Sequence, residues 1–210
     1  PLELTEEERV EYKKVNNKFV EHKMALDPDA FQYAKIALSS SSVSYEMKAH
    51  AAGFYKTIRE RKSIVDKAHN KIAKFKDIVY SNLDKKIITF GGLNEFTDML
   101  AESVSPLAEV YHSKITTKNK REALRRFKEG EVNVLCSTKA LNQGFDIPNA
   151  NLGIICGLTS KSLSMIQRVG RLIRYEEGKT GKVYVLYIKD SQEEKWLKNA
   201  VYDLKGVTWM

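Results

Sequence analysis

From residue 86 onward, short apolar runs rich in β-branched residues alternate with segments of helical length, and this alternation constrains the fold most. Five runs of this kind are predicted as strands: Lys86–Phe90, Ala108–His112, Val132–Cys136, Leu152–Cys156 and Lys182–Ile188. Strands that alternate with helices form parallel sheets, and continuously apolar strands are buried on both faces. We therefore expect an α/β fold, a mainly parallel sheet with helices on both faces.

The segments between these strands have the periodicity of helices. The predicted helices run from after Gly91-Gly92 to about Ser103, from Thr117 as the cap to Gly130, over Ser162–Arg174 and over Ser191–Leu204. In a parallel sheet, ligands bind at the carboxyl ends of the strands. The loops that follow the strands are therefore the candidate functional positions.

The first third of the chain has helical patterning only. Thr5 and Glu8 form a capping box that opens a helix ending near Leu26, and Asp27-Pro28 begins a second helix. The serine run Ser39–Ser42 breaks the pattern. The stretch that follows, from Tyr45 to Tyr80, has slips in its periodicity near Arg61–Ser63 that indicate two helices. We expect an all-helical extension over residues 1–76 before an α/β domain over residues 77–210.

Composition excludes several classes of protein. A hydrophobic content of 42% provides a core, so global disorder is excluded. The apolar runs are much shorter than the roughly 20 residues of a membrane-spanning helix, and Thr5–Arg9 is charged where a signal peptide would be apolar. Cys136 and Cys156 lie inside apolar runs, which predicts buried thiols and no metal site. We expect an intracellular protein, cytoplasmic or nucleoid-associated.

The net charge of +8 is concentrated in two segments. Lys48–Lys76 holds nine basic and two acidic residues, and Tyr111–Gly130 holds seven basic and two acidic residues. Such local excesses suit a polyanionic partner, and two solvated helix faces are the alternative.

The segment Gln167–Arg174 predicts phosphate binding. At about 100° per residue, Gln167, Arg171 and Arg174 share one helix face, whereas Arg168 points elsewhere. Guanidinium groups present planar, always-charged donors that match phosphate oxygens. Gly170 lies beside them inside the helix, at a cost of up to about 1 kcal/mol, which favours a close contact over a merely solvated face.

The segment Ser137–Pro148 follows a buried strand and carries several polar groups. Ser137 and Thr138 offer hydroxyl and backbone N–H groups to a phosphate. Gly144 permits a tight backbone turn, and Asp146 is an acceptor for a ribose hydroxyl. Taken alone, the segment also fits an ordinary capped loop.

Together, these segments resemble the second RecA-like domain of superfamily 2 helicases, over about residues 85 to 204. Lys86–Phe90 resembles motif IV, Ala140–Pro148 resembles motif V, and Gln167–Arg174 matches the motif VI pattern Gln-x-x-Gly-Arg-x-x-Arg. Gln at the head of motif VI is closer to XPB-like, phage recombination and Swi2/Snf2-type members than to DEAD-box helicases. By analogy, it favours DNA over RNA.

The resemblance implies a role for each candidate residue. Arg171 and Arg174 would be arginine fingers toward ATP, with Gln167 near the γ-phosphate, while Gly144 and Asp146 would contact the nucleotide. The expected nucleic-acid contacts are Gly91, Gly92, His112, Ser137 and Thr138. ATP would bind with Mg²⁺ in a cleft shared with a partner, the N-terminal RecA-like domain of the same parent protein.

The sequence contains no Gly-x-x-x-x-Gly-Lys-Ser/Thr loop and no Asp-Glu-x-His/Asp box. We therefore expect this chain to be a piece of a longer enzyme and to be inactive toward ATP alone. Two alternatives remain: a non-hydrolysing RecA-like module that binds nucleic acid or protein, and, with less support, half of a nucleotide-sugar transferase.

Overall fold

The computed structural model describes residues 1–26, 29–138, 150–160, 166–167 and 181–202. These residues divide into two compact units. One unit consists of Leu4–Val65, and the other joins Pro1–Glu3 to Asp66–Met210. The division falls between Val65 and Asp66, whereas the sequence placed the boundary after residue 76.

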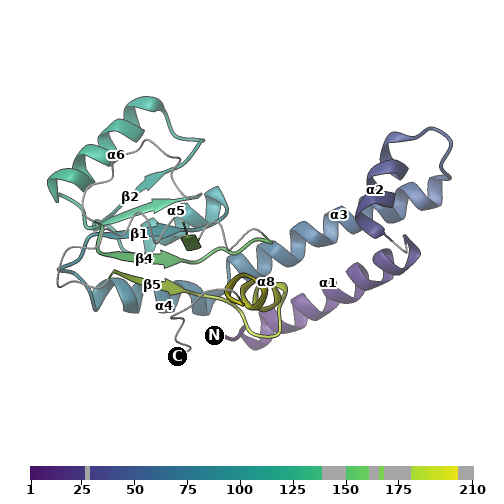
Figure 1. The fold of residues 1–210 in the computed structure, drawn as a ribbon, viewed down its shortest axis with the longest axis horizontal. Helices are drawn as coiled ribbons and strands as arrows, with labels where there is room; N and C mark the ends of the chain where they lie inside the picture. Colours follow the sequence, from purple (N-terminus) through teal and green to yellow (C-terminus); the bar gives the residue numbers. More distant parts are fainter. Residues whose placement is uncertain (27–28, 139–149, 161–165, 168–180, 203–210) are drawn as a thin grey trace. The chain divides into compact units, whose positions relative to one another are not determined.

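The helical unit contains α1 (Glu6–Ala25), α2 (Ala30–Ser39) and α3 (Tyr45–Asp66) (Figure 1). The predicted capping box is present, because the Thr5 hydroxyl accepts from the Glu8 N–H and the Glu8 carboxylate accepts from the Thr5 N–H. The Asp29 side chain accepts from the Gln32 N–H and caps α2, while Asp27 and Pro28, which were predicted to begin this helix, lie outside the described residues. Phe54 stacks on Phe19 with ring centroids 5.4 Å apart and anchors the small core of this unit.

The sheet unit contains five parallel strands in the order β2-β3-β1-β4-β5. Their bounds are β1 Ile87–Phe90, β2 Ala108–Tyr111, β3 Val134–Ser137, β4 Leu152–Ile155 and β5 Lys182–Val185. All four residues of β1, β3 and β4 are buried, which explains why these runs lack polar alternation. The predicted parallel α/β sheet is confirmed.

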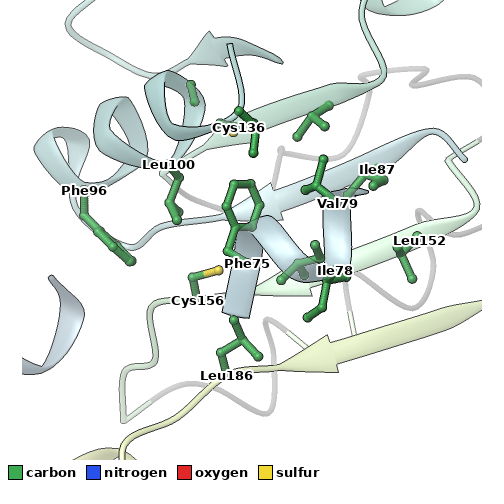
Figure 2. Close-up of a cluster of buried hydrophobic side chains, with 14 residues drawn as sticks. Phe75, Ile78, Val79, Ile87, Phe96, Leu100, Cys136, Leu152, Cys156 and Leu186 are labelled. Atoms are coloured by element: carbon green, nitrogen blue, oxygen red, sulfur yellow. The ribbon is translucent and has the colours of Figure 1, made fainter. Parts of the chain in front are cut away.

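Helices cover both faces of this sheet (Figure 1). The helices are α4 (His69–Tyr80) and α5 (Asn94–Ser103) on one face, and α6 (Thr117–Glu129) and α8 (Gln192–Val201) on the other. Successive strand residues alternate between the two cores: Ile87 faces α4 and α5, while Ile88 faces α6 and α8. Figure 2 shows Phe75 and Val79 of α4 beside Ile87.

Two local predictions differ from the structure. The break between α3 and α4 lies at Lys67–Ala68, several residues after the predicted slip, and α4 belongs to the sheet unit because Phe75 and Val79 pack in its core. The cap of α6 is Thr116, whose hydroxyl accepts from the Asn119 N–H. The predicted helix over Ser162–Arg174 lies outside the described residues, apart from Ile166 and Gln167.

Candidate functional site

The loop after β1 lies against the end of β3. The N–H of Gly91 donates to the carbonyl of Ser137 over 2.9 Å, and the N–H of Gly92 donates to the carbonyl of Thr138 over 3.2 Å. The backbone amides of these two predicted nucleic-acid contacts are therefore already paired within the chain. The side chain of Ser137 is buried, whereas Thr138 is half-buried.

Glycines allow two loops to touch at this edge. Gly92 has φ of 80°, in the left-handed region that favours glycine. A Cβ on Gly157, just after β4, would lie 2.2 Å from the carbonyl oxygen of Gly91. Close contact between the backbones after β1 and β4 therefore requires Gly157, a residue that was not among the predicted site residues.

Three side chains, one from the residue after β3 and two from α5, form a hydrogen-bonded group here. The Thr138 hydroxyl donates to Oδ1 of Asn94 over 2.7 Å and lies 3.4 Å from the hydroxyl of Thr97. The Thr97 hydroxyl donates to the carbonyl of Leu93 over 2.8 Å. Thr138 thus contacts the first turn of α5.

Asn94 is a candidate site residue that sequence reasoning missed. It begins α5, whose N-cap, Leu93, provides no side-chain hydrogen bond to the helix. Backbone N–H groups at such a start suit an anion, and the oxygen of the Asn94 amide is held by Thr138. The sequence feature that could have identified Asn94 is its position at the start of a helix, two residues after Gly92.

The fifth predicted nucleic-acid contact, His112, is buried and engaged on both ring nitrogens. Its Nε2 lies 2.7 Å from Oδ1 of Asp98, and its Nδ1 accepts from the N–H of Lys114 at 3.3 Å. The ring therefore joins α5 to the loop after β2. Any effect of His112 on a ligand would act through this loop.

Cations on α6 differ in their pairing. Arg125 bonds Glu122, Glu129 and Glu131, and Arg126 bonds Glu109 and Glu131. Near the start of the helix, Lys118 and Arg121 are exposed, and neither makes an ion pair within the described part of the chain. The helix dipole disfavours cations in a first turn, so Lys118 stabilises the fold little.

The nucleotide-side prediction is only partly covered by the structure. Gln167 is helical and exposed. Arg171, Arg174, Gly144 and Asp146 lie outside the described residues.

The described residues were also compared with the requirements of a reactive thiol, a metal site and a membrane-spanning helix. Cys136 and Cys156 are buried, and burial raises the pKa of both thiols, that of Cys156 to about 12. Within the described ranges, no group of three or more His, Cys, Asp and Glu side chains could hold a metal ion. No helix in the same ranges is both long and apolar enough to cross a bilayer.

The fold and the strand ends together define the class of an α/β domain with a parallel sheet and polar loops at its carboxyl edge. Residues 60–176, more than half of the chain, match the family model described as helicase conserved C-terminal domain. The chain therefore belongs to this family, and the predicted relation to superfamily 2 helicases is confirmed.

Two curated relatives show the range of the family. A Methanocaldococcus jannaschii protein, provisionally named an ATP-dependent RNA helicase, is 32% identical over 65% of this chain and 19% of its own length. The Sulfurisphaera tokodaii protein named DNA 3'-5' translocase XPB2 is 26% identical over 56% of this chain and 26% of its own length. This chain thus spans about a quarter or less of the length of each of these relatives.

Solved structures confirm the RecA-like fold. The Sulfolobus solfataricus SWI2/SNF2 ATPase core domain has a TM-score of 0.62 at 17% identity, covering 97% of this chain and 42% of that one. The C-terminal part of the Fun30 ATPase domain has a TM-score of 0.63 at 14% identity, covering 94% and 86%.

Proposed function

We propose that this chain is the C-terminal motor domain of an ATP-dependent helicase or translocase that acts on DNA. The observation that carries the proposal is the polar group of Thr138, Asn94 and Thr97 at the carboxyl edge of a helicase-family sheet. Preference for DNA rests on Gln167 at the head of the motif VI pattern. ATP is the substrate, and an N-terminal RecA-like domain would supply the P-loop and the Mg²⁺ ligands.

On the nucleotide side, Arg171 and Arg174 would meet the β- and γ-phosphates when the two domains close. Guanidinium groups that arrive on closure stabilise the charge of the transition state more than the bound ground state. Gln167 would orient the γ-phosphate or its water. Gly144 and Asp146 would contact the nucleotide, Asp146 through the ribose.

On the nucleic-acid side, the donors would be the amide nitrogen of Asn94, which the Thr138 hydroxyl orients, and the first N–H groups of α5. Such groups contact phosphates and do not read bases, so binding would be largely independent of sequence. Gly91, Gly92 and Ser137 would shape this edge through their backbone pairing, and His112 would position the loop before α6. Lys118 and Arg121 would add long-range attraction.

The test is ATP hydrolysis by the complete protein and by this chain alone. The complete protein should hydrolyse ATP faster with DNA present, and this chain alone should match a buffer blank. ATP hydrolysis by this chain alone would contradict the proposal that the N-terminal RecA-like domain supplies the P-loop and the Mg²⁺ ligands. Binding of DNA by a complete protein that hydrolyses no ATP would favour the non-hydrolysing module, and stimulation by RNA but not by DNA would overturn the choice of nucleic acid.

A further inference from the structure

A lysine and a glutamate form an ion pair deep inside the sheet unit. Lys71 of α4 is 0% exposed and Glu193 of α8 is 1% exposed, and Nζ of Lys71 lies 2.7 Å from Oε1 of Glu193. Lys71 also donates to the carbonyl oxygen of Cys156, at the end of β4, over 2.8 Å. Both charged groups are therefore held at the carboxyl edge of the sheet.

The Glu193 carboxylate joins three separate segments. Besides Lys71, its Oε1 accepts from the N–H of Leu158 at 3.3 Å, and its Oε2 accepts from the N–H of Ile188 at 3.1 Å. The hydroxyl of Ser191 accepts from the N–H of Glu193 and caps α8, so the carboxylate is presented from the first turn of that helix. One side chain thus ties the backbone after β4 to the backbone after β5.

Stability alone does not explain this pair. Taking an ammonium and a carboxylate out of water is costly, and apolar residues of similar volume are often as stabilising. The pKa of Glu193 is raised, first by burial and further by the nearby buried Asp66, while Lys71 opposes the rise. Burial therefore disfavours the charged form of Glu193, and the contact with Lys71 favours it.

The tethered backbone leads directly to the arginine-bearing segment. Leu158 stands nine residues before Gln167 in the chain. Its side chain is fully buried in the core beneath α6 and α8, so side chain and backbone are both fixed. Arginine fingers act through placement, and a small displacement of a positioned group lowers the rate of the chemical step strongly.

We infer that Lys71 and Glu193 are positioning residues for the arginine fingers, which they place by fixing the backbone at Leu158. This inference rests on the proposed function. It separates two roles for the pair: a purely structural pair would matter only through folding stability, whereas a positioning pair sets the rate of hydrolysis even in a protein that is fully folded.

The test uses Lys71→Met, Glu193→Gln and the double variant in the complete enzyme. Each single change leaves one buried group without its partner and should lower the melting temperature, and the double change should recover most of that loss. We expect the double variant to keep its KM for ATP within about threefold and to lose about tenfold or more in kcat. Lys198→Met is the matched control on α8, because the Lys198 side chain in its ion pair with Glu194 is exposed, and it should leave kcat unchanged.

A double variant that melts with the wild type and keeps kcat within about twofold would overturn the inference, because positioning would then be unnecessary. If the double variant folds poorly, kcat of Glu193→Gln is measured well below its melting temperature, and a value within about twofold of the wild type would overturn the inference in the same way. Hydrogen exchange of peptides covering Leu158 and Ile188 gives a readout independent of ATP. The amides of these peptides should exchange about tenfold faster in the double variant than in Lys198→Met. Equal exchange rates in the two variants would contradict the claim that Glu193 fixes this backbone. A wild-type enzyme without ATP hydrolysis would refute the proposed function, while the exchange result would still decide the tether.

Discussion

The hydroxyl of Thr138 donates a hydrogen bond to Oδ1 of Asn94 over 2.7 Å, joining the residue after β3 to the first residue of α5. This bond uses the hydroxyl proton and leaves an oxygen lone pair at the sheet edge. It also directs the amide group of Asn94. A strand end and a helix start therefore act as one polar site.

Thr138→Val should weaken DNA binding, because valine keeps the shape of threonine and removes the hydroxyl that orients Asn94. We expect affinity to fall about three- to tenfold, the value of one neutral hydrogen bond. The dependence on salt should not change, since a neutral hydroxyl releases no counterion. Fluorescence anisotropy at several salt concentrations measures both quantities. Ser103→Ala, at the other end of α5, is the control, and an equal loss in both variants would refute the assignment.

Lys118→Ala and Arg121→Ala should each weaken DNA binding and reduce its salt dependence. Each lost phosphate contact lowers the slope of log affinity against log salt by about 0.7 to 0.9. Arg125→Ala is the matched control on the same helix, because three glutamates already pair with its guanidinium group. Titrations between about 50 and 200 mM salt give the slopes. The prediction fails if Arg125→Ala lowers the slope as much as Lys118→Ala does.

The thiols of Cys136 and Cys156 should resist reagents in the folded protein. Burial raises the pKa of Cys156 from its ordinary value of 9.0 to about 12, so the folded state retains a proton that the unfolded state loses above pH 9. Stability should therefore fall as the pH rises from 9 toward 12. Thermal melts between pH 9 and 12 should show that the melting temperature falls less steeply with pH in Cys156→Ala than in the wild type. Rapid labelling of the native thiols at pH 8 would contradict their burial (Figure 2).

The sheet could be predicted from the sequence because its pattern is local and strong. The runs that became β1, β3 and β4 are apolar throughout, and a strand buried on both faces needs no other signal. The α6 helix was predicted from its periodicity, although its cap is Thr116 and not Thr117, since adjacent threonines are equally suitable caps.

Features that depend on distant residues could not be predicted. Lys71 looks like a solvent-exposed helix residue, and only its contact with Glu193 explains its burial. The pairing of the Gly91 and Gly92 amides with the carbonyls of Ser137 and Thr138 depends on β3 lying beside β1 in the sheet, which no local pattern shows. The parallel bridge between Leu2 and Ile188 joins nearly opposite ends of the chain and left no local pattern.

Single-turnover ATP hydrolysis by the complete enzyme tests whether Arg171 and Arg174 complete the ATPase site of a two-domain motor. Arg171→Ala and Arg174→Ala should each lower the rate by about 10³-fold, roughly 4 kcal/mol, with little change in ATP affinity. Arg171→Lys should recover little, because an ammonium does not replace the planar fork of a guanidinium group. Arg168→Ala, which removes an arginine from another face of the same segment, should keep the rate and lower only the melting temperature. Near-wild-type hydrolysis by Arg171→Ala, together with loss of hydrolysis in a folded Arg168→Ala, would contradict the account.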